Sequence, residues 1–265
     1  MKGHIPHRNR LWLYLLVGIL LVFLILPSLL VVPMSFNHST LMVFPPKQWS
    51  LRWYNNFLGN SLWIDSFIVS LKVAVLTMIV ATPIGVAAAY SLHVGSFKFR
   101  RLIEFILTLP MLVPVILMAI GLFFVYARLS MVNTIPGLVI AYTLLAIPFV
   151  LITVGAGLKT YDMSQEMVAR SLGASWLVAF LTVTLPQIKL SVISGALFAF
   201  IIAFDEVVIA QFLSGGSTST LTKVMFASVR DEIDPTIAAV STILLFVTIL
   251  PPLLLHIAAT HNRSK

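Results

Sequence analysis

Long apolar blocks separated by short polar segments make up most of this chain. A helix needs about 20 mostly apolar residues to cross the hydrocarbon core of a bilayer. We expect a membrane-spanning helix at each of six such blocks, at about Leu11–Pro33, Leu62–Leu92, Phe105–Ala127, Val132–Gly157, Leu190–Leu213 and Thr236–Ala258. The pattern predicts an all-α integral membrane protein in which residues 1–265 form a single transmembrane domain.

Prolines and the first block refine this picture. Neighbouring helices can satisfy the carbonyl groups that a proline leaves unpaired in a membrane helix, so we expect kinks inside the blocks. The first block is too long for the apolar region of a signal peptide, and no small-residue cleavage site follows it, so we expect an uncleaved anchor. The prolines inside the blocks are Pro27, Pro83, Pro110, Pro114 and Pro148.

Composition agrees with a membrane protein and excludes several kinds of chemistry. Charged residues make up 10% of the chain, against about 25% in soluble domains, and the mean hydropathy is +1.03. The chain has no cysteine, which excludes disulfides, thiolate metal ligands and a thiol nucleophile. No metal-ligand spacing and no catalytic set are visible, so we expect no metal, no cofactor and no catalysis. The scattered histidines are His4, His7, His38, His93, His256 and His261.

Basic residues predict the orientation in the membrane, because Lys and Arg are enriched in short cytoplasmic loops. With the N-terminus inside, eleven basic residues lie inside and five outside, and Lys72 is left within the second block. We therefore expect both termini to be cytoplasmic, and the net charge of +8 needs no nucleic-acid partner. The inside set is Lys2, Arg8, Arg10, Lys98, Arg100, Arg101, Lys159, Arg170, Lys189, Arg263 and Lys265, and the outside set is Lys47, Arg52, Arg128, Lys223 and Arg230.

The first outside loop carries a predicted short helix, Leu51–Leu58, with Ser50 as its N-cap and Gly59 as its end. Its aromatic side chains suit either the membrane interface, in contact with lipid, or an external partner.

The loop 159–189 predicts a helix–Gly–helix unit on the cytoplasmic side. Asp162 and Gln165 have the spacing of a capping box, and the helix that follows runs to about Leu172. Gly173 fits the C′ position after this helix. Ser175 can cap a second helix, which Pro186 would stop. Met167, Val168 and Leu172 share one face, with Glu166 and Arg170 near another, so the unit alone is also typical of an interfacial helix pair on lipid.

This loop resembles the coupling loop of ABC importer permeases, the "EAA" loop. The family pattern is Glu-Ala-Ala, three residues, Gly, nine residues, Ile, one residue and Leu-Pro. Gly173, Val183 and Leu185-Pro186 keep this spacing, with Val in place of Ile. The Glu-Ala-Ala element falls on Met167-Val168-Ala169, where only Ala169 matches, and Glu166 lies one position early.

The resemblance extends over most of the chain. It is most similar to the second permease subunit of spermidine/putrescine importers, and permeases for opines, aminoethylphosphonate and other small solutes have similar sequences. The further segments that carry it are "FPPKQWSLRWYNNFL", "LTLPMLVPVILMAIGLF", "AIPFVLITVGAGLK", "FDEVVIAQFLSG" and "IDPTIAAVSTILL".

The resemblance implies a bacterial inner-membrane complex and not an enzyme. A second, homologous permease subunit would pair with this chain, two ATP-binding subunits would grip one coupling loop each, and an extracytoplasmic substrate-binding protein would deliver the cargo. The residues that it implies for the contact with the ATPase are Glu166, Met167, Val168, Ala169, Arg170, Gly173 and Pro186.

Two adjacent acids, Asp205 and Glu206, lie in the fifth block, about 15 residues or roughly 22 Å from its inner end. A charge at that depth usually faces a cavity or a partner. Two interpretations stay open: at least one acid lines the route of a cationic substrate, or the acids are structural, for example paired with Lys72 or with the second permease.

The sequence Leu213-Ser214-Gly215-Gly216 looks like a nucleotide-contacting signature, but the predicted topology puts it outside, and no phosphate-binding Gly-x-x-x-x-Gly-Lys-Ser/Thr loop occurs. We interpret it as a turn. For Asp231, Glu232 and Asp234 we expect capping of the last helix and solvation, with a binding protein or a cation as the alternative; Asp65 is a weaker candidate of this kind.

Three other functions stay as alternatives. The first is a permease for another small polar solute. A secondary transporter would be expected to show an inverted repeat, which is not detectable. A membrane-embedded enzyme would need acids or histidines on facing helices, whereas the two buried acids here share one helix.

Overall fold

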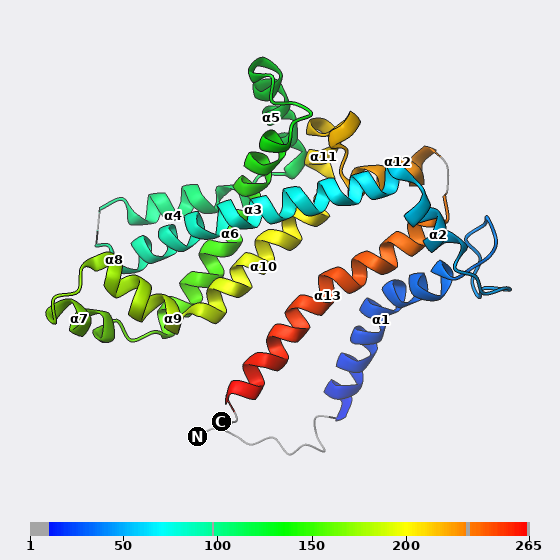
Figure 1. The fold of residues 1–265 in the computed structure, drawn as a ribbon. Helices are drawn as coiled ribbons and strands as arrows, with labels where there is room; N and C mark the ends of the chain where they lie inside the picture. The colour runs from blue at the N-terminus through cyan, green and yellow to red at the C-terminus, as the bar shows by residue number, and fades with distance from the viewer. Residues whose placement is uncertain (1–10, 97, 232–233, 264–265) are drawn as a thin grey trace. The chain divides into compact units, whose positions relative to one another are not determined.

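The computed structural model describes residues 11–96, 98–231 and 234–263, and these are almost entirely helical (Figure 1). Among the described residues, four helices are long and apolar enough to cross a membrane, or six if two bent pairs each count as one span. This bears out the predicted all-α membrane fold. The longer elements are α1 (Leu11–Ser35), α2 (Arg52–Gly59), α3 (Ser61–Val94), α4 (Arg100–Thr108), α5 (Val115–Leu129), α6 (Ile135–Thr160), α10 (Lys189–Asp205), α11 (Val208–Leu213), α12 (Leu221–Asp231) and α13 (Thr236–Arg263).

The third and fifth predicted spans are not continuous helices. The segments Arg100–Met111 and Val115–Leu129 meet at 95°, because Pro110 and Pro114 lack the N–H groups that a continuing helix needs. The fifth span breaks after Asp205, and α11 starts again at Val208. The prolines predict the first break, whereas no proline lies at the second.

The chain divides into two compact units, one made of residues 1–61 and 228–249 and the other of residues 62–227 and 250–265. In the first unit, residues 12–29 of α1 expose their side chains on all sides, as a helix surrounded by lipid can, while its last turn is partly buried. Helix α2 lies one residue later than predicted, and the hydroxyl of Ser50 accepts a hydrogen bond from the N–H of Arg52 at 3.1 Å. Asn56 of α2 donates to Thr236 at 2.8 Å, which ties α2 to the start of α13.

In the second unit α6 packs between α3 and α10, and small residues allow this close approach. Val150 of α6 is fully buried. A Cβ atom at Gly85 of α3 would lie 2.6 Å from the Cβ of Val150, and one at Gly195 of α10 would lie 3.3 Å from its Cγ1. A single branched side chain therefore fills the space that two glycines leave on either side.

We predict that Gly85→Val lowers the stability of the purified chain by about 1–3 kcal/mol, because overpacking pushes α3 and α6 apart. The measurement is the unfolding midpoint in a denaturing-detergent titration followed by circular dichroism. The control is Gly121→Val in α5, where an added Cβ meets nothing within 4 Å. Equal midpoints for the two variants would contradict the close approach at Gly85.

Candidate functional site

The loop after α6 forms the predicted helix–Gly–helix unit. Helix α7 (Ser164–Ser171) is followed by α8 (Trp176–Ala179), a wide π turn (Phe180–Thr184) and α9 (Leu185–Gln187). Gly173 has φ +98°, and its N–H donates to the carbonyl of Arg170 at 3.0 Å. The N–H of Ala174 donates to the carbonyl of Ala169 at 3.1 Å, which completes the glycine end of a helix as predicted.

The two ends predicted for this unit need correction. Asp162 does not form a capping box: its carboxylate accepts the N–H of Ser164 at 3.0 Å, and α7 starts at Ser164. This hydrogen bond lowers the pKa of Asp162. Ser175 caps α8 as predicted, accepting from Val178 at 3.4 Å. Pro186 does not stop the helix, because it lies in the first turn of α9, where its missing N–H costs no hydrogen bond.

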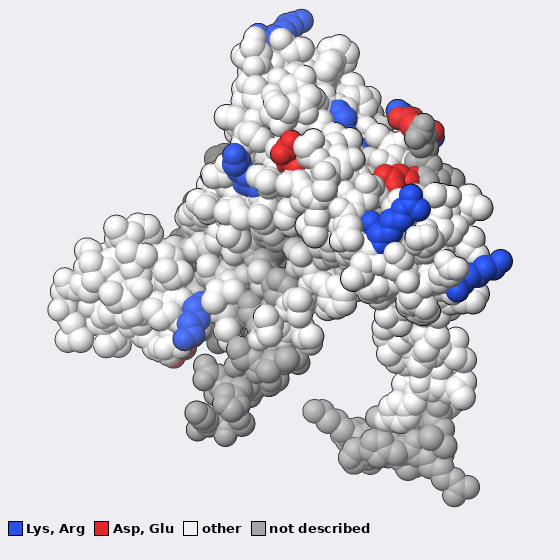
Figure 2. Space-filling view, turned by 45° about the vertical axis from the view of Figure 1, so that its right-hand side comes forward, with Lys and Arg blue, Asp and Glu red and all other residues white. Residues whose placement is uncertain are grey.

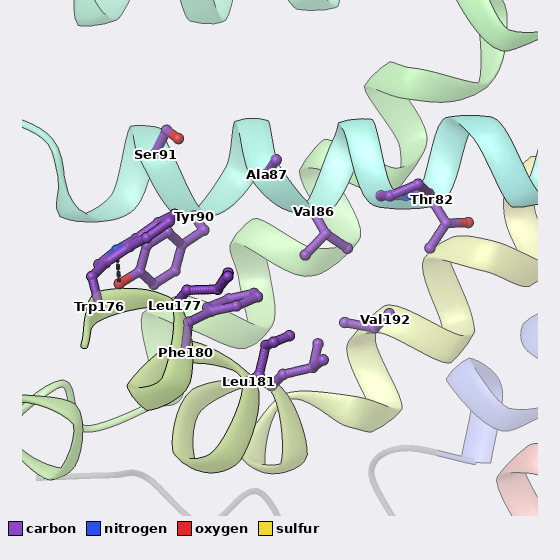
Figure 3. A pocket seen from close by; sticks show the side chains of 12 residues that line it. Thr82, Val86, Ala87, Tyr90, Ser91, Trp176, Leu177, Phe180, Leu181 and Val192 are labelled. Carbon is purple, nitrogen blue, oxygen red and sulfur yellow. Dashed lines mark hydrogen bonds between the residues drawn. The ribbon is translucent and has the colours of Figure 1, made fainter. Parts of the chain in front are cut away.

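Glu166 anchors the loop to the membrane helices. Its side chain is only 1% exposed. One carboxylate oxygen accepts a hydrogen bond from the hydroxyl of Tyr90 in α3, and the other accepts one from the hydroxyl of Thr184 in the π turn. Trp176 of α8 in turn donates its indole N–H to the Tyr90 oxygen at 3.1 Å (Figure 3). One buried acid thus joins α3, α7 and the π turn, with α8 attached through Tyr90.

Three large apolar side chains of α7 and its C-cap are exposed, next to polar residues of the same helix. Met167, Val168 and Leu172 are 59%, 58% and 84% exposed, while the acidic residue of the same helix points inward. Arg170 is exposed beside them, and Ala169 is half-buried. Met167, Val168 and Leu172 are exposed together as expected, but Glu166 and Arg170 do not share a face, because Glu166 is buried and Arg170 is exposed. The polar contacts of Glu166 are made inside this chain.

A cavity of about 410 Å³ lies between α3, the second half of the loop and α10 (Figure 3). Its walls are almost entirely apolar, and Tyr90 with Trp176 closes one end. Phe180 packs edge-on against the Tyr90 ring at 4.7 Å between centroids. Aromatic packing therefore supports the same Tyr90 side chain that donates to Glu166.

At the break in the fifth span, the two adjacent acids have different surroundings. Asp205 is the last residue of α10, and its side chain is exposed. Glu206 turns inward: its Oε1 accepts the N–H of Ile209 at 3.0 Å, which caps α11. Its backbone carbonyl accepts from Thr222 at 3.0 Å and from Tyr142 at 3.4 Å. Glu206 therefore shapes the break, while Asp205 stands beside it.

Lys72 does not pair with either acid. It is exposed on α3, and in the part of the chain that the structure describes the one salt bridge joins Arg230 to Asp231. No group of three or more metal-ligating side chains occurs among these described residues either. Residues 1–10 and 264–265 lie outside the described residues, and they include His4 and His7 as well as Lys2, Arg8, Arg10 and Lys265 of the inside set.

The sequence Leu213–Gly216 is a turn, as predicted. Helix α11 ends at Leu213, and Gly216 has φ +57°. The ammonium of Lys223 in α12 donates hydrogen bonds to the carbonyl of Ser214 and, at 3.3 Å, to that of Gln211. Lys223 therefore caps the end of α11. Burial lowers the pKa of Lys223.

Of the acids before the last helix, one caps a helix and another is exposed, as in the pair in the fifth span. Asp234 accepts the N–H of Thr236 at 2.8 Å, which confirms the predicted cap of α13. Asp231 forms an exposed ion pair with Arg230 at 2.7 Å, and Asp65 is exposed. Glu232 lies outside the described residues. Figure 2 shows that charged side chains occur in small separate groups on a mostly uncharged surface.

Comparison with known proteins decides the family. Residues 81–260 match the family model of the binding-protein-dependent transport system inner membrane component. This chain belongs to that family. The permease is 30% identical over 250 residues to the putrescine transport system permease protein PotI of Escherichia coli, covering 92% of this chain and 89% of PotI. It is 27% identical over 227 residues to the spermidine/putrescine transport system permease protein PotC of Haemophilus influenzae, covering 86% and 88%.

The fold is also that of solved ABC transporters. A chain of a bacterial ABC transporter involved in alginate import matches with a TM-score of 0.71 at 16% identity, over 98% of this chain and 99% of that one. Another structure, of an alginate ABC transporter with a pentasaccharide-bound periplasmic protein, gives a TM-score of 0.67 at 15% identity, covering 92% and 93%. The chain is therefore a permease subunit of an ABC importer, and ATP hydrolysis belongs to partner subunits.

Sequence reasoning missed the partners of Glu166. Tyr90 is 76 residues away from it in the chain, and Thr184 is 18 residues away. A signal was present, since a glutamate in an apolar, membrane-proximal segment needs donors, and tyrosine near the end of a span can supply one. Tyr142 and Thr222 at the break of the fifth span were missed for the same reason.

We predict that Tyr90→Phe loosens the loop without unfolding the bundle. The change leaves Glu166 with one donor fewer and the indole N–H of Trp176 unpaired, at a cost of about 1–3 kcal/mol. Amide hydrogen exchange of residues 164–188 should rise by on the order of tenfold or more, while exchange in α6 stays constant. Tyr126→Phe in α5, whose buried hydroxyl has no hydrogen-bond partner among the described residues, is the control. Unchanged exchange in the Tyr90 variant would disprove the anchor.

Proposed function

We propose that this permease forms half of a translocation pathway for polyamines of the spermidine and putrescine type. The observation that carries the proposal is the exposed Asp205 at the break of the fifth span. The names of the relatives PotI and PotC point in the same direction, because both are polyamine permeases. A polyamine carries two or more positive charges, so we expect negatively charged groups along its route.

The geometry around Asp205 suits a cation. The C-terminal carbonyl groups of a helix carry a partial negative charge, and Asp205 adds a full one at the end of α10. Interrupted membrane helices use their C-terminal ends in this way to coordinate cations. Glu206 is occupied with the N–H of Ile209, so Asp205 is the acid that we assign to the substrate pathway, and Glu206 keeps the break in shape.

The loop 159–189 is, in our proposal, the part that the ATPase moves. Two cytoplasmic ATP-binding subunits would bind one coupling loop each, one on this chain and one on a second, homologous permease, while an extracytoplasmic binding protein delivers the substrate. Met167, Val168 and Leu172 offer an exposed apolar face for this contact, with Arg170 at its side. Both termini then lie in the cytoplasm of a bacterium, and residues 1–265 act as a single permease domain in the inner membrane.

Uptake of a diamine tests the role of Asp205. In proteoliposomes that contain the complete transporter, Asp205→Asn should lower putrescine uptake by on the order of tenfold, the value of one charge-assisted hydrogen bond. Assembly of the complex should stay intact. Asp65→Asn removes the same charge from another exposed position and should have little effect.

Three results would count against this assignment. Unchanged uptake by the Asp205 variant would remove the acid from the pathway. Failure of assembly would make it structural. Equal loss of uptake of an uncharged solute would favour a permease for another small polar solute.

Gly173 tests the coupling loop. Residues with a Cβ atom rarely adopt its φ of +98°, although nothing lies within 4 Å of a Cβ atom added there. Gly173→Val should therefore strain the turn by about 1–2 kcal/mol and reduce the substrate transported per ATP hydrolysed. Gly173→Asn is the control, because Asn tolerates positive φ. Full coupling in the Val variant would argue that this turn does not transmit the movement of the ATPase.

A further inference from the structure

A second cavity, separate from the apolar one behind the loop, lies between α3, α4 and α6. It has a volume of about 210 Å³, and its polar lining comes from His93 of α3, Arg100, Glu104 and Thr108 of α4, and Lys159 of α6. Each of the three helices therefore brings a basic side chain to one hollow. Glu104 is the one carboxylate of the lining, so positive charge exceeds negative charge inside it.

The position of this cavity follows from where its residues lie in their helices. His93 is next to the last residue of α3, Arg100 is the first of α4, and Lys159 is next to the last of α6. These helix ends gather beside the loop that contains α7 and α8 (Figure 1), at the end for which we propose a cytoplasmic location. The cavity is then at the depth where phospholipid phosphates lie.

Exposed apolar side chains lie next to the basic groups. Ile152 lines the cavity and is 52% exposed, and Phe105, on the helix that carries Glu104, is 52% exposed as well. Apolar side chains that continue from a basic hollow suit a ligand with a charged head and apolar chains. A small water-soluble anion would leave them without contacts.

We propose that this cavity binds the phosphate group of an anionic phospholipid, with Arg100 and Lys159 as its cationic contacts. Basic pockets between membrane helices on the cytoplasmic side suit such head groups. Arginine matches phosphate with two parallel N–H groups, and lysine acts as a compact charge. Thr108 is a further hydroxyl in the wall, although its hydrogen now bonds to the carbonyls of Glu104 and Phe105.

Orientation in the membrane alone does not require this arrangement. Lys98 and Arg101 are also basic, exposed and at the same helix ends, but they do not line the cavity. They satisfy the enrichment of basic residues in cytoplasmic loops equally well. Lys98 and Arg101 therefore serve as a matched control for Arg100, since they carry the same charge nearby without lining the cavity.

The test measures lipid binding to the full chain in detergent by native mass spectrometry, after delipidation and titration with phosphatidylglycerol or phosphatidylcholine. The first variant is Arg100→Gln/Lys159→Gln, and its matched control is Lys98→Gln/Arg101→Gln. We expect the first to bind phosphatidylglycerol on the order of 10- to 30-fold more weakly, since each basic residue contributes about fivefold. The control and the binding of phosphatidylcholine should change little.

Glu104→Gln gives an opposite prediction that loss of folding cannot imitate. Removal of the carboxylate should strengthen phosphatidylglycerol binding by a few fold. Equal lipid binding in the cavity and control variants would overturn the proposal, and so would weaker binding in Glu104→Gln. Inorganic phosphate distinguishes the source of the anion: if it competes with phosphatidylglycerol at similar concentration, the cavity is a site for free anions and the lipid proposal fails.

Discussion

The architecture of the loop 159–189 depends on one constraint, that a buried carboxylate must have hydrogen-bond donors. Glu166 is 1% exposed, and leaving such a group unpaired costs several kcal/mol. Its two oxygens are satisfied by Tyr90 and Thr184, from elements far apart in the chain. This requirement fixes α7 against α3 and turns the apolar side of α7 outward. Met167, Val168 and Leu172 are thus left exposed, as the contact that we propose with the ATPase requires.

The same constraint separates Asp205 from Glu206. An acid that bonds to backbone N–H groups contributes to the fold, and Glu206 does so by capping α11. The backbone carbonyl of Glu206 at the break accepts from both Tyr142 and Thr222, and Lys223 caps the far end of α11. With these partners the chain can be interrupted in the middle of a span at little cost. Asp205 is exposed beside these contacts, which agrees with the role in the substrate pathway that we propose for it.

The apolar pattern was enough to predict the helices, because about 20 apolar residues have few other uses in a protein. Gly173 and Ser175 could be assigned from the sequence because their signals are local: one backbone conformation and one hydroxyl. The break at Asp205 and the burial of Glu166 could not. Both depend on side chains that arrive from elsewhere, such as Tyr90 and Tyr142, and a helical pattern does not record which donors a fold will bring together. Pro110 and Pro114 lie between these cases, since proline predicts a bend but not its angle.

The Glu166 contact and Asp205 are connected through α9 and α10. Thr184, which holds one oxygen of Glu166, lies directly before α9, and after a sharp bend α10 runs 17 residues to Asp205. At 1.5 Å per residue that helix is about 25 Å long. Under the proposed function, a partner that displaces α7 must either break the hydrogen bonds of Glu166 or move α3 and the start of α10 with it. The second course costs less, because separating a buried acid from its donors leaves it unpaired. Under the same proposal, α10 would carry the movement from the bend after α9, next to the Glu166 contact, to Asp205 at its other end.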